Sequence, residues 1–295
     1  MFEVQFDTGS SDLWIPQAGC VYCAGKNTYN HNLSSTYMPV GGTLNDTYGL
    51  GCVVGPLSMD NVTVGGFAVK NQVFAEIPDL SSENASHYLT QAYDGILGLA
   101  FPKASGKAGA YPVVFENMIE QNLLDQLVFS LYLGDNEPGW DATKFNGEIY
   151  KVPLSSAAFW QIELQGFVLG KGRHAQSVPA IVDSGTSFIS GPPEAIQVIA
   201  EIFGAIAFDQ NGDYFANCSH IGTLPRIGFI VGGLELLIPG HKAFLPPTDG
   251  YCKLAFGIHE GFWILGDTFM RGFYTVFIYV ERTVDWLCNF GHKKQ

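Results

Sequence analysis

Short apolar runs separated by turn-forming residues make up most of this 295-residue chain. The runs are rich in Val, Ile, Phe and Tyr, and 35 Gly and 15 Pro punctuate them, which predicts a mostly β protein. Apolar residues recur at helical spacing over 113–122 and 193–203, so we expect helices there. The length allows two domains of ordinary size, and 47% hydrophobic residues suffice for a core in each.

One short pattern occurs twice, each time at the end of an apolar run. FDTGSS begins at Phe6, and VDSGTS begins at Val182. An aspartate at the end of a buried strand costs free energy unless something stabilises it. Each copy is followed further along by an apolar pair and a glycine, ILG at Ile96 and again at Ile264. This repetition disfavours two unrelated turns and predicts a duplicated unit that brings two carboxyl groups face to face.

Two carboxyl groups a few ångströms apart have a well-defined chemistry. They cannot both ionise easily, so Asp7 and Asp183 would share one proton and titrate as a pair. The charged member takes a proton from a water held between them, and the protonated member donates to the carbonyl oxygen under attack. The glycine of each copy allows a tight turn. The hydroxyls of Ser10 and Thr186 are placed to bond the outer carboxylate oxygens.

Longer segments extend the similarity beyond the aspartates: FDTGSSDLWIP, YDGILGLAFP, IVDSGTSFISGP and FWILGDTFMRGFYTVF. With them, nearly the whole chain resembles the pepsin-like aspartic endopeptidases, such as pepsin, cathepsin D and cathepsin E. The resemblance implies a mostly β, bilobal acid protease fold, in which a cleft separates two lobes related by a pseudo-twofold axis. We expect an N-terminal lobe over residues 1–150 and a C-terminal lobe over 151–295, with one catalytic aspartate in each and no cofactor.

The resemblance also suggests roles for residues around the aspartates. Tyr48 and Gly49 match the flap, a hairpin that closes over the substrate, with Trp14 as the hydrogen-bond partner of Tyr48; an ordinary strand tyrosine and a core tryptophan are the alternatives. An extended peptide would bind by strand addition. The expected substrate-binding residues are Gly9, Ser10, Tyr48, Gly49, Gly185 and Thr186, with Tyr93, Ile96 and Phe159 lining pockets. These liners predict a preference for bulky apolar residues, although each also suits a plain core position.

Charge narrows the expected partners. The net charge is -13 and the pI is about 4.8, which disfavours nucleic acid as a partner and suits an acidic compartment. No apolar run reaches 18 residues, so no membrane span is expected, and no cluster at metal-ligand spacing predicts a metal site. We expect a monomer that binds protein or peptide substrates and statine-type inhibitors.

Cysteines and glycosylation motifs both indicate an oxidising compartment. The resemblance pairs Cys20 with Cys23 and Cys218 with Cys252, and the states of Cys52 and Cys288 stay open. Asn-x-Ser/Thr motifs are more frequent than chance predicts and indicate glycosylated surface loops in the secretory route. They lie at Asn32, Asn45, Asn61, Asn84 and Asn217. The expected destination is extracellular or a lysosome-like acidic compartment.

The chain also departs from the family pattern. It begins only six residues before Asp7 and shows no signal peptide, so we expect the family's N-terminal segment to be lacking. An apolar strand expected before Gly139 is also missing. Leu50 stands where the flap has Thr, and Ile278 where the family has Asp. A second function therefore stays open beside that of an acid endopeptidase: a catalytically impaired relative that binds peptides or partners in the cleft.

Overall fold

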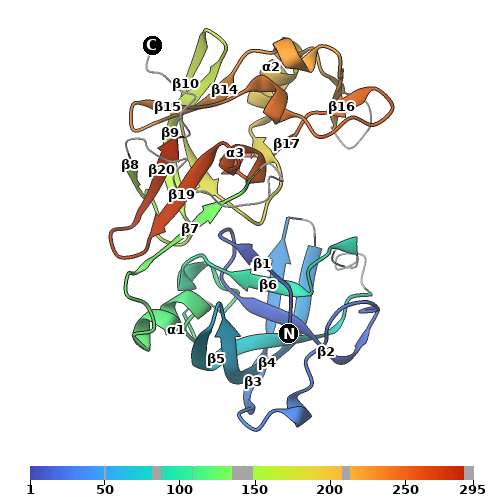
Figure 1. Ribbon diagram of the computed structural model, residues 1–295, viewed down its shortest axis with the longest axis vertical. Helices are drawn as coiled ribbons and strands as arrows, with labels where there is room; N and C mark the ends of the chain where they lie inside the picture. The colour runs from blue at the N-terminus through green and yellow to red at the C-terminus, as the bar shows by residue number, and fades with distance from the viewer. Residues whose placement is uncertain are drawn as a thin grey trace. The chain divides into compact units, whose positions relative to one another are not determined.

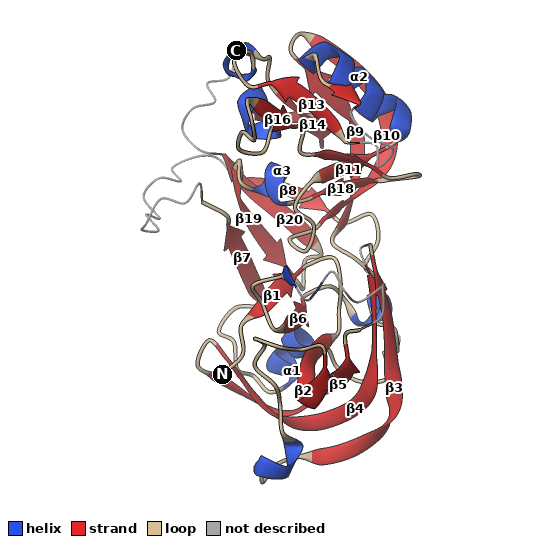
Figure 2. Cartoon of the chain, turned by 90° about the vertical axis from the view of Figure 1, so that its right-hand side faces the viewer, coloured by secondary structure: helices blue, strands red, loops and turns tan. Residues whose placement is uncertain are grey.

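Strands form most of the computed structural model, which describes residues 1–49, 51–81, 88, 90–107, 109–134, 149–207 and 213–288, the side chains of Ala207 and Cys288 apart. The chain is mostly β, as predicted, and several sheets contribute to it (Figures 1 and 2). It divides into two compact units, Met1–Leu127 and Val128–Gln295, which is consistent with the two-lobed pepsin-like fold. The lobe boundary predicted at residues 150 and 151 falls within the second unit, inside the strand Ile149–Pro153.

The first unit contains one six-stranded sheet. Its strands are β1 (Val4–Asp7), β2 (Leu13–Val21), β3 (Met38–Tyr48), β4 (Gly51–Val64), β5 (Phe67–Asp79) and β6 (Gly95–Gly98). Their spatial order is β1-β6-β2-β5-β4-β3, so β1 and β3 are the edge strands. β1 pairs in parallel with β6, which lies far along the sequence but beside it in Figure 1. Helix α1 (Val114–Glu120) forms inside the predicted range 113–122.

A long hairpin of β3 and β4 extends beyond the rest of this sheet (Figure 2). The two strands pair from Met38 and Met59 up to Tyr48 and Gly51. Pairing of β4 with β5 begins only at Leu57, so residues 43–48 and 51–56 have ladder partners only within the hairpin. A two-stranded hairpin alone is marginally stable in water. Side-chain contacts therefore decide how this segment is held against the unit.

The described residues of the second unit form three sheets. Its strands are β7 (Val128–Tyr132), β8 (Ile149–Pro153), β9 (Gln161–Leu169), β10 (Gly172–Val182), β11 (Ile189–Gly191), β12 (Ile206–Ala207), β13 (Tyr214–Asn217), β14 (Ile227–Val231), β15 (Leu234–Ile238), β16 (Tyr251–Lys253), β17 (Phe256–Ile258), β18 (Trp263–Leu265), β19 (Phe273–Ile278) and β20 (Thr283–Cys288). The largest sheet has the order β15-β14-β9-β10-β18-β11-β17, the second β7-β19-β20-β8, and the smallest β12-β13-β16. Because β7 pairs with β19, the unit begins before the predicted boundary.

Two α-helices lie in the described part of the second unit. α2 (Pro193–Phe203) coincides with the predicted range and ends at Gly204, whose left-handed conformation suits a residue without a Cβ. α3 (Asp267–Met270) is a single turn, too short for a helical pattern to show in the sequence. Among the described residues, no helix has the length and apolar character needed to cross a membrane.

Buried aromatic rings pack around strands that lie near the aspartate motifs. In the second unit Trp263 on β18 packs edge-on against Phe229, with ring centroids 5.0 Å apart, and Phe229 packs against Phe269 at 5.7 Å. In the first unit Trp14 is fully buried in a cluster that includes Leu44 and Ile96. Burying one such side chain contributes about 2–3 kcal/mol, so these contacts stabilise β18 and β2.

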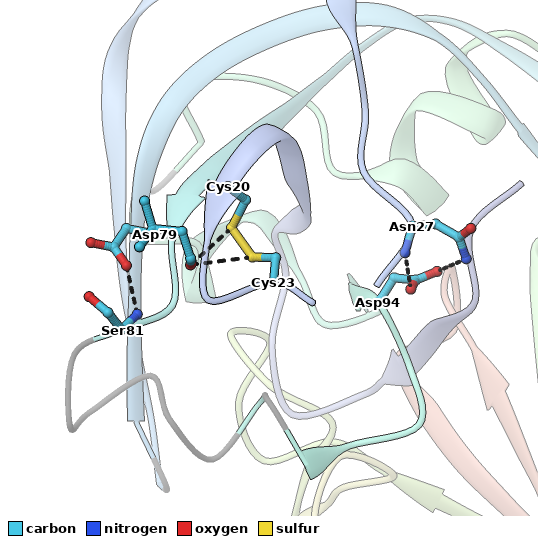
Figure 3. Close-up of a disulfide and its surroundings, with 7 residues drawn as sticks. Cys20, Cys23, Asn27, Asp79, Ser81 and Asp94 are labelled. Atoms are coloured by element: carbon cyan, nitrogen blue, oxygen red, sulfur yellow. Dashed lines mark hydrogen bonds between the residues drawn. A yellow bond between two sulfur atoms is a disulfide. The ribbon is translucent and has the colours of Figure 1, made fainter. Parts of the chain in front are cut away.

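Both predicted disulfides are present in the structure. Cys20–Cys23 closes a turn at the end of β2, beside Asp79 and Ser81 (Figure 3). Cys218–Cys252 joins residues 34 positions apart and ties the end of β13 to β16. Cys52 is a free cysteine.

Removing the longer disulfide should destabilise the second unit more than removing the shorter one destabilises the first. The Cys218→Ser, Cys252→Ser pair of changes should lower the free energy of unfolding by about 4 kcal/mol, against about 1.5 kcal/mol for Cys20→Ser, Cys23→Ser, because a longer closed loop restricts the unfolded chain more. Urea unfolding with intrinsic fluorescence measures both. Equal losses from the two pairs would contradict this explanation.

Candidate active site

The first aspartate loop begins where β1 ends. Asp7 is only 4% exposed. Its Oδ1 accepts the backbone N–H of Gly9 at 2.8 Å, and its Oδ2 accepts the Ser10 hydroxyl at 2.5 Å. Hydrogen bonds of this kind stabilise a charged carboxylate that has been removed from water. The loop therefore offsets the cost of burying Asp7.

The second loop repeats this arrangement bond for bond. Asp183 follows β10 and is 8% exposed. Its Oδ1 accepts the N–H of Gly185 at 2.8 Å, and its Oδ2 accepts the Thr186 hydroxyl at 2.6 Å. The serine of the first loop and the threonine of the second thus each donate to the Oδ2 atom of their own aspartate. Each unit, taken by itself, contains one carboxylate in the same cradle.

A nested glycine completes each loop. Gly98, at the end of β6, lies so close to Ser11 that a Cβ at Gly98 would meet the Ser11 backbone at 2.3–2.5 Å. Gly266, after β18, lies against the carbonyls of Thr186 and Phe188, which its Cβ would meet at 2.2 and 2.3 Å. Any larger residue would push the loop away from the strand. The repeated ILG sequence is therefore a steric requirement of the two aspartate loops.

The two approach strands differ in burial. β10 is an inner strand, and Ala180 and Val182 on it are fully buried. β1 is an edge strand, and Phe6 immediately before Asp7 is 44% exposed. The expectation of a buried strand before each aspartate is therefore wrong for the first copy. An edge strand has a neighbour on one side only, which leaves part of β1 uncovered.

Tyr48 lies at the end of β3, in the hairpin predicted to be the flap. Its hydroxyl accepts the indole N–H of Trp14 at 3.0 Å, the expected hydrogen bond. Tyr88 packs edge-on against both rings, with centroids 5.1 Å from Trp14 and 6.0 Å from Tyr48. Burial, followed by the nearby charges of Asp46 and Asp7, raises the pKa of Tyr48 well above its usual value. Tyr48 is therefore a neutral donor and acceptor near Asp7.

The proposed pocket liners have different surroundings. Tyr93 is half-buried, and its pKa rises to about 12 through burial and the charge of Asp7, so it lies near that carboxylate. Ile96 belongs to the buried cluster around Trp14, the surroundings of a plain core residue. Phe159 is half-buried in the second unit. Gly49 lies at the exposed turn of the hairpin, and Leu50 lies outside the described residues.

A polar network holds the segment that precedes β6 (Figure 3). Asp94 accepts the backbone N–H of Glu3 at 2.9 Å and both the backbone and side-chain N–H of Asn27 at 2.8 and 2.9 Å. Burial alone would raise the pKa of Asp94. The hydrogen bonds from Asn27 and Glu3 and the positive charge of Lys26 outweigh this effect, so the pKa is lowered. The start of the chain is thereby attached to the strand that nests against the Asp7 loop.

Several polar residues near the loops were not predicted. Asp12 is 2% exposed, and Asp46 lies on the inward face of β3 with Leu44 and Tyr48. Strand alternation alone would have indicated the inward position of Asp46. Asp267 begins α3, directly after the nested glycine of the second loop. Burial raises its pKa to about 6; Arg271 opposes the shift and the charge of Asp183 adds to it.

The described glycosylation motifs lie on the surface. The asparagine of each is exposed, and the four are Asn32, Asn45, Asn61 and Asn217. Asn84 and the side chain of Cys288 lie outside the described residues, as does the segment 135–148, where a strand is expected to be missing.

This chain is mostly β and holds one aspartate in the same cradle in each of its two units. That arrangement is typical of proteins whose paired carboxyl groups come from two copies of a duplicated fold. A family model described as eukaryotic aspartyl protease matches residues 1–286. Cathepsin E-B of Xenopus laevis is 37% identical over 296 residues, 94% of this chain and 73% of that protein. Pepsin A of Bos taurus is 38% identical over 94% of this chain and 77% of its own, and cathepsin D of Clupea harengus 35% over 94% and 75%. The chain belongs to the eukaryotic aspartyl protease family and is, by that membership, an aspartic-type endopeptidase.

Adding a methyl group at either nested glycine should loosen its unit. Gly98→Ala and Gly266→Ala should each lower the free energy of unfolding by about 3 kcal/mol, because the new Cβ overlaps backbone atoms that have no room to move. Gly222→Ala is the control, since a Cβ there meets nothing within 4 Å. Chemical denaturation measures all three, and a loss at Gly222 as large as at Gly98 would refute the steric explanation.

The raised pKa of Asp267 predicts a pH-dependent contribution to stability. In the unfolded chain this carboxyl titrates near 3.8, and in the folded chain near 6. Its contribution is therefore complete below about pH 4 and is lost as the pH rises through 6. Asp267→Asn should flatten the fall in melting temperature over this range. An unchanged pH profile in thermal unfolding of the variant would contradict the assignment.

Proposed function

We propose that Asp7 and Asp183 are the catalytic pair of an acid endopeptidase. The observation that supports this most directly is the repeated cradle, in which each carboxylate accepts one backbone N–H and one hydroxyl. Two independent aspartates would have no reason to share this pattern. With one proton between them, the charged member activates a water and the protonated member donates to the peptide carbonyl. Hydrolysis then needs no covalent intermediate.

The cradle suits this chemistry because it fixes orientation. Each carboxylate is held at both oxygens, so it cannot rotate freely about its own bond. General acid–base catalysis depends on a correct distance between the group and the proton that it moves. Ser10 and Thr186 are positioning residues in this proposal, since they bind the carboxylates rather than the substrate.

Peptide binding is proposed to use the backbone of the loops and of the flap. Gly9, Gly185 and Gly49 offer main-chain groups to an extended strand, and Tyr48 closes over it. Tyr93, Ile96 and Phe159 would favour bulky apolar side chains next to the scissile bond. The position of Tyr93 near Asp7 supports its share in this role, whereas the burial of Ile96 allows only an indirect one.

The proposed setting is an acidic extracellular or lysosome-like compartment reached through the secretory route. Two disulfides, the exposed asparagines of the described glycosylation motifs and a net charge of -13 support it. The protein would act as a glycosylated monomer on protein and peptide substrates, without nucleic acid, and statine-type transition-state mimics would inhibit it.

Replacing either catalytic aspartate should abolish activity. Asp7→Asn and Asp183→Asn should each lower kcat/KM by at least about a thousandfold, because neither carboxyl completes the proton transfers alone. Cleavage of a denatured protein between about pH 3 and pH 7 measures this; the wild type should work on the acid side only, since one carboxyl must be protonated.

Asp79→Asn is the matched control, because Asp79 is an exposed carboxyl of the first unit. Substantial turnover by either active-site variant would disprove the mechanism. A folded wild type that binds a statine-type inhibitor but cleaves nothing would instead identify a catalytically impaired relative.

A further inference from the structure

A second pair of carboxyl groups lies under the hairpin that carries Tyr48. Asp12 directly precedes β2 and is almost completely buried, whereas Asp46 lies on β3 and is half-buried. Both carboxyl groups lie against Gly106, whose N–H donates to Asp12 Oδ2 at 3.0 Å and whose Cβ, if present, would meet Asp46 Oδ1 at 2.2 Å. Two ionised carboxylates are acceptors only, so a hydrogen bond between them needs a proton on one. A direct hydrogen bond between these two carboxyl groups therefore requires the protonated form of one of them.

The surrounding donors indicate which member holds the proton. Asp12 accepts three hydrogen bonds, from the Ser105 hydroxyl at 2.9 Å, the Gly106 N–H at 3.0 Å and the Tyr111 hydroxyl at 2.9 Å. Both oxygens of Asp12 therefore already act as acceptors. Asp46 accepts only a longer bond of 3.4 Å from the Tyr48 hydroxyl, besides a contact with the N–H of Gly106. Asp46 is therefore the member that holds the proton.

The electrostatic surroundings favour the same state. Burial raises the pKa of Asp46 to about 7, the charge of Asp12 and the bond to it add to this, and the bonds from Tyr48 and Gly106 oppose it. The other titratable groups that face this pair are neutral or acidic, namely Tyr48, Tyr88 and Tyr111, with Cys52 and Asp7 beyond them. Among the described residues, neither Asp12 nor Asp46 takes part in a salt bridge.

The position of the pair gives it control over the hairpin. β3 is an edge strand, and residues 43–48 and 51–56 have ladder partners only within the hairpin. Three side chains face inward from this part of β3. Leu44 enters the core, Asp46 contacts Asp12, and Tyr48 accepts the indole N–H of Trp14. A Cβ at Gly106 would meet Asp46 Oδ1 at 2.2 Å, so the body of the unit fits closely around this carboxyl.

We propose that Asp12 and Asp46 form a proton-dependent latch that holds the hairpin closed and positions Tyr48. The proposal rests on the proposed function in one respect, the role of Tyr48 in covering the substrate. Asp46 acts through Tyr48, whose hydroxyl lies between the Trp14 indole and the Asp46 carboxyl. Ionisation of Asp46 places two negative charges side by side and removes the shared proton. The hairpin then loses one of its three inward contacts.

The sign of the pH dependence follows from the raised pKa of Asp46. Its unfolded value is 3.8 and its folded value is about 7. The latch is therefore at full strength below about pH 4 and is lost as the pH rises through 7. The hairpin should stay closed in an acidic compartment and open near neutral pH.

Hydrogen–deuterium exchange of the substrate-free protein tests the latch without any need for activity. Exchange is followed by mass spectrometry between pH 4.5 and pH 8, with correction for the intrinsic pH dependence of amide exchange. In the wild type, the protection of residues 43–56 relative to β5 should fall by about tenfold or more over this range. Protection of residues 43–56 that stays parallel to that of β5 would overturn the proposal, whatever the variants do.

Asp46→Asn mimics the protonated carboxyl, because its amide can donate to Asp12 and accept from Tyr48. This variant should keep the acid-side protection at every pH, whereas Asp46→Ala should lose it at every pH. Asp79→Asn, an exposed carboxyl elsewhere in the unit, should behave as the wild type does. A pH-dependent loss in Asp46→Asn equal to that of the wild type would also refute the latch.

Kinetics then separates positioning from catalysis. With a fluorogenic peptide, the wild-type KM should rise several-fold as the pH approaches 7, and Asp46→Asn should remove this rise while leaving the pH dependence of kcat unchanged. If KM in Asp46→Asn rises as it does in the wild type, the latch does not position Tyr48. If the chain cleaves no peptide, the proposed function fails, but the exchange experiment still decides on the latch.

Discussion

Burying a carboxylate costs free energy unless hydrogen-bond donors replace the water around it, and both aspartate loops are built to supply such donors. A backbone N–H can reach its own aspartate two residues away only through a tight turn, and the hydroxyl one residue further completes the set. The turn in turn needs a strand packed closely behind it. Gly98 and Gly266 allow that approach. The chemistry of one side chain thus dictates the residues of two distant segments.

The rest of each unit maintains this approach. In the second unit, the aromatic contacts of Trp263 hold β18 beside β10. In the first, the hydrogen bonds of Asp94 attach the start of the chain to β6, so that an edge strand with an exposed Phe6 still delivers Asp7 accurately. One local geometry is therefore supported by two different kinds of interaction, apolar packing in one unit and polar attachment in the other.

The sequence predicted those structural features that have a repeated or periodic pattern along the chain. The two aspartate loops, the nested glycines and the amphipathic helix 193–203 all have such patterns, and the structure contains them. The bond between Tyr48 and Trp14 followed from the family resemblance. The contact between Asp12 and Asp46 was not predicted, because neither residue belongs to a repeat and their pairing depends on the course of the hairpin. The exposure of Phe6 was missed because hydropathy does not distinguish an edge strand from an inner one.

The parallel pairing of β1 with β6, and of β10 with β18, has a consequence for folding kinetics. Glu3 and Asp94 bond across 91 positions, and Ser187 and Thr268 across 81. Such contacts form only after a long segment of chain has been closed into a loop, which costs conformational entropy before any contact rewards it and makes folding slow. The strands behind each aspartate loop are therefore expected to join late in folding. A partly folded chain lacks that support, so its aspartates are not yet held as they are in the finished units.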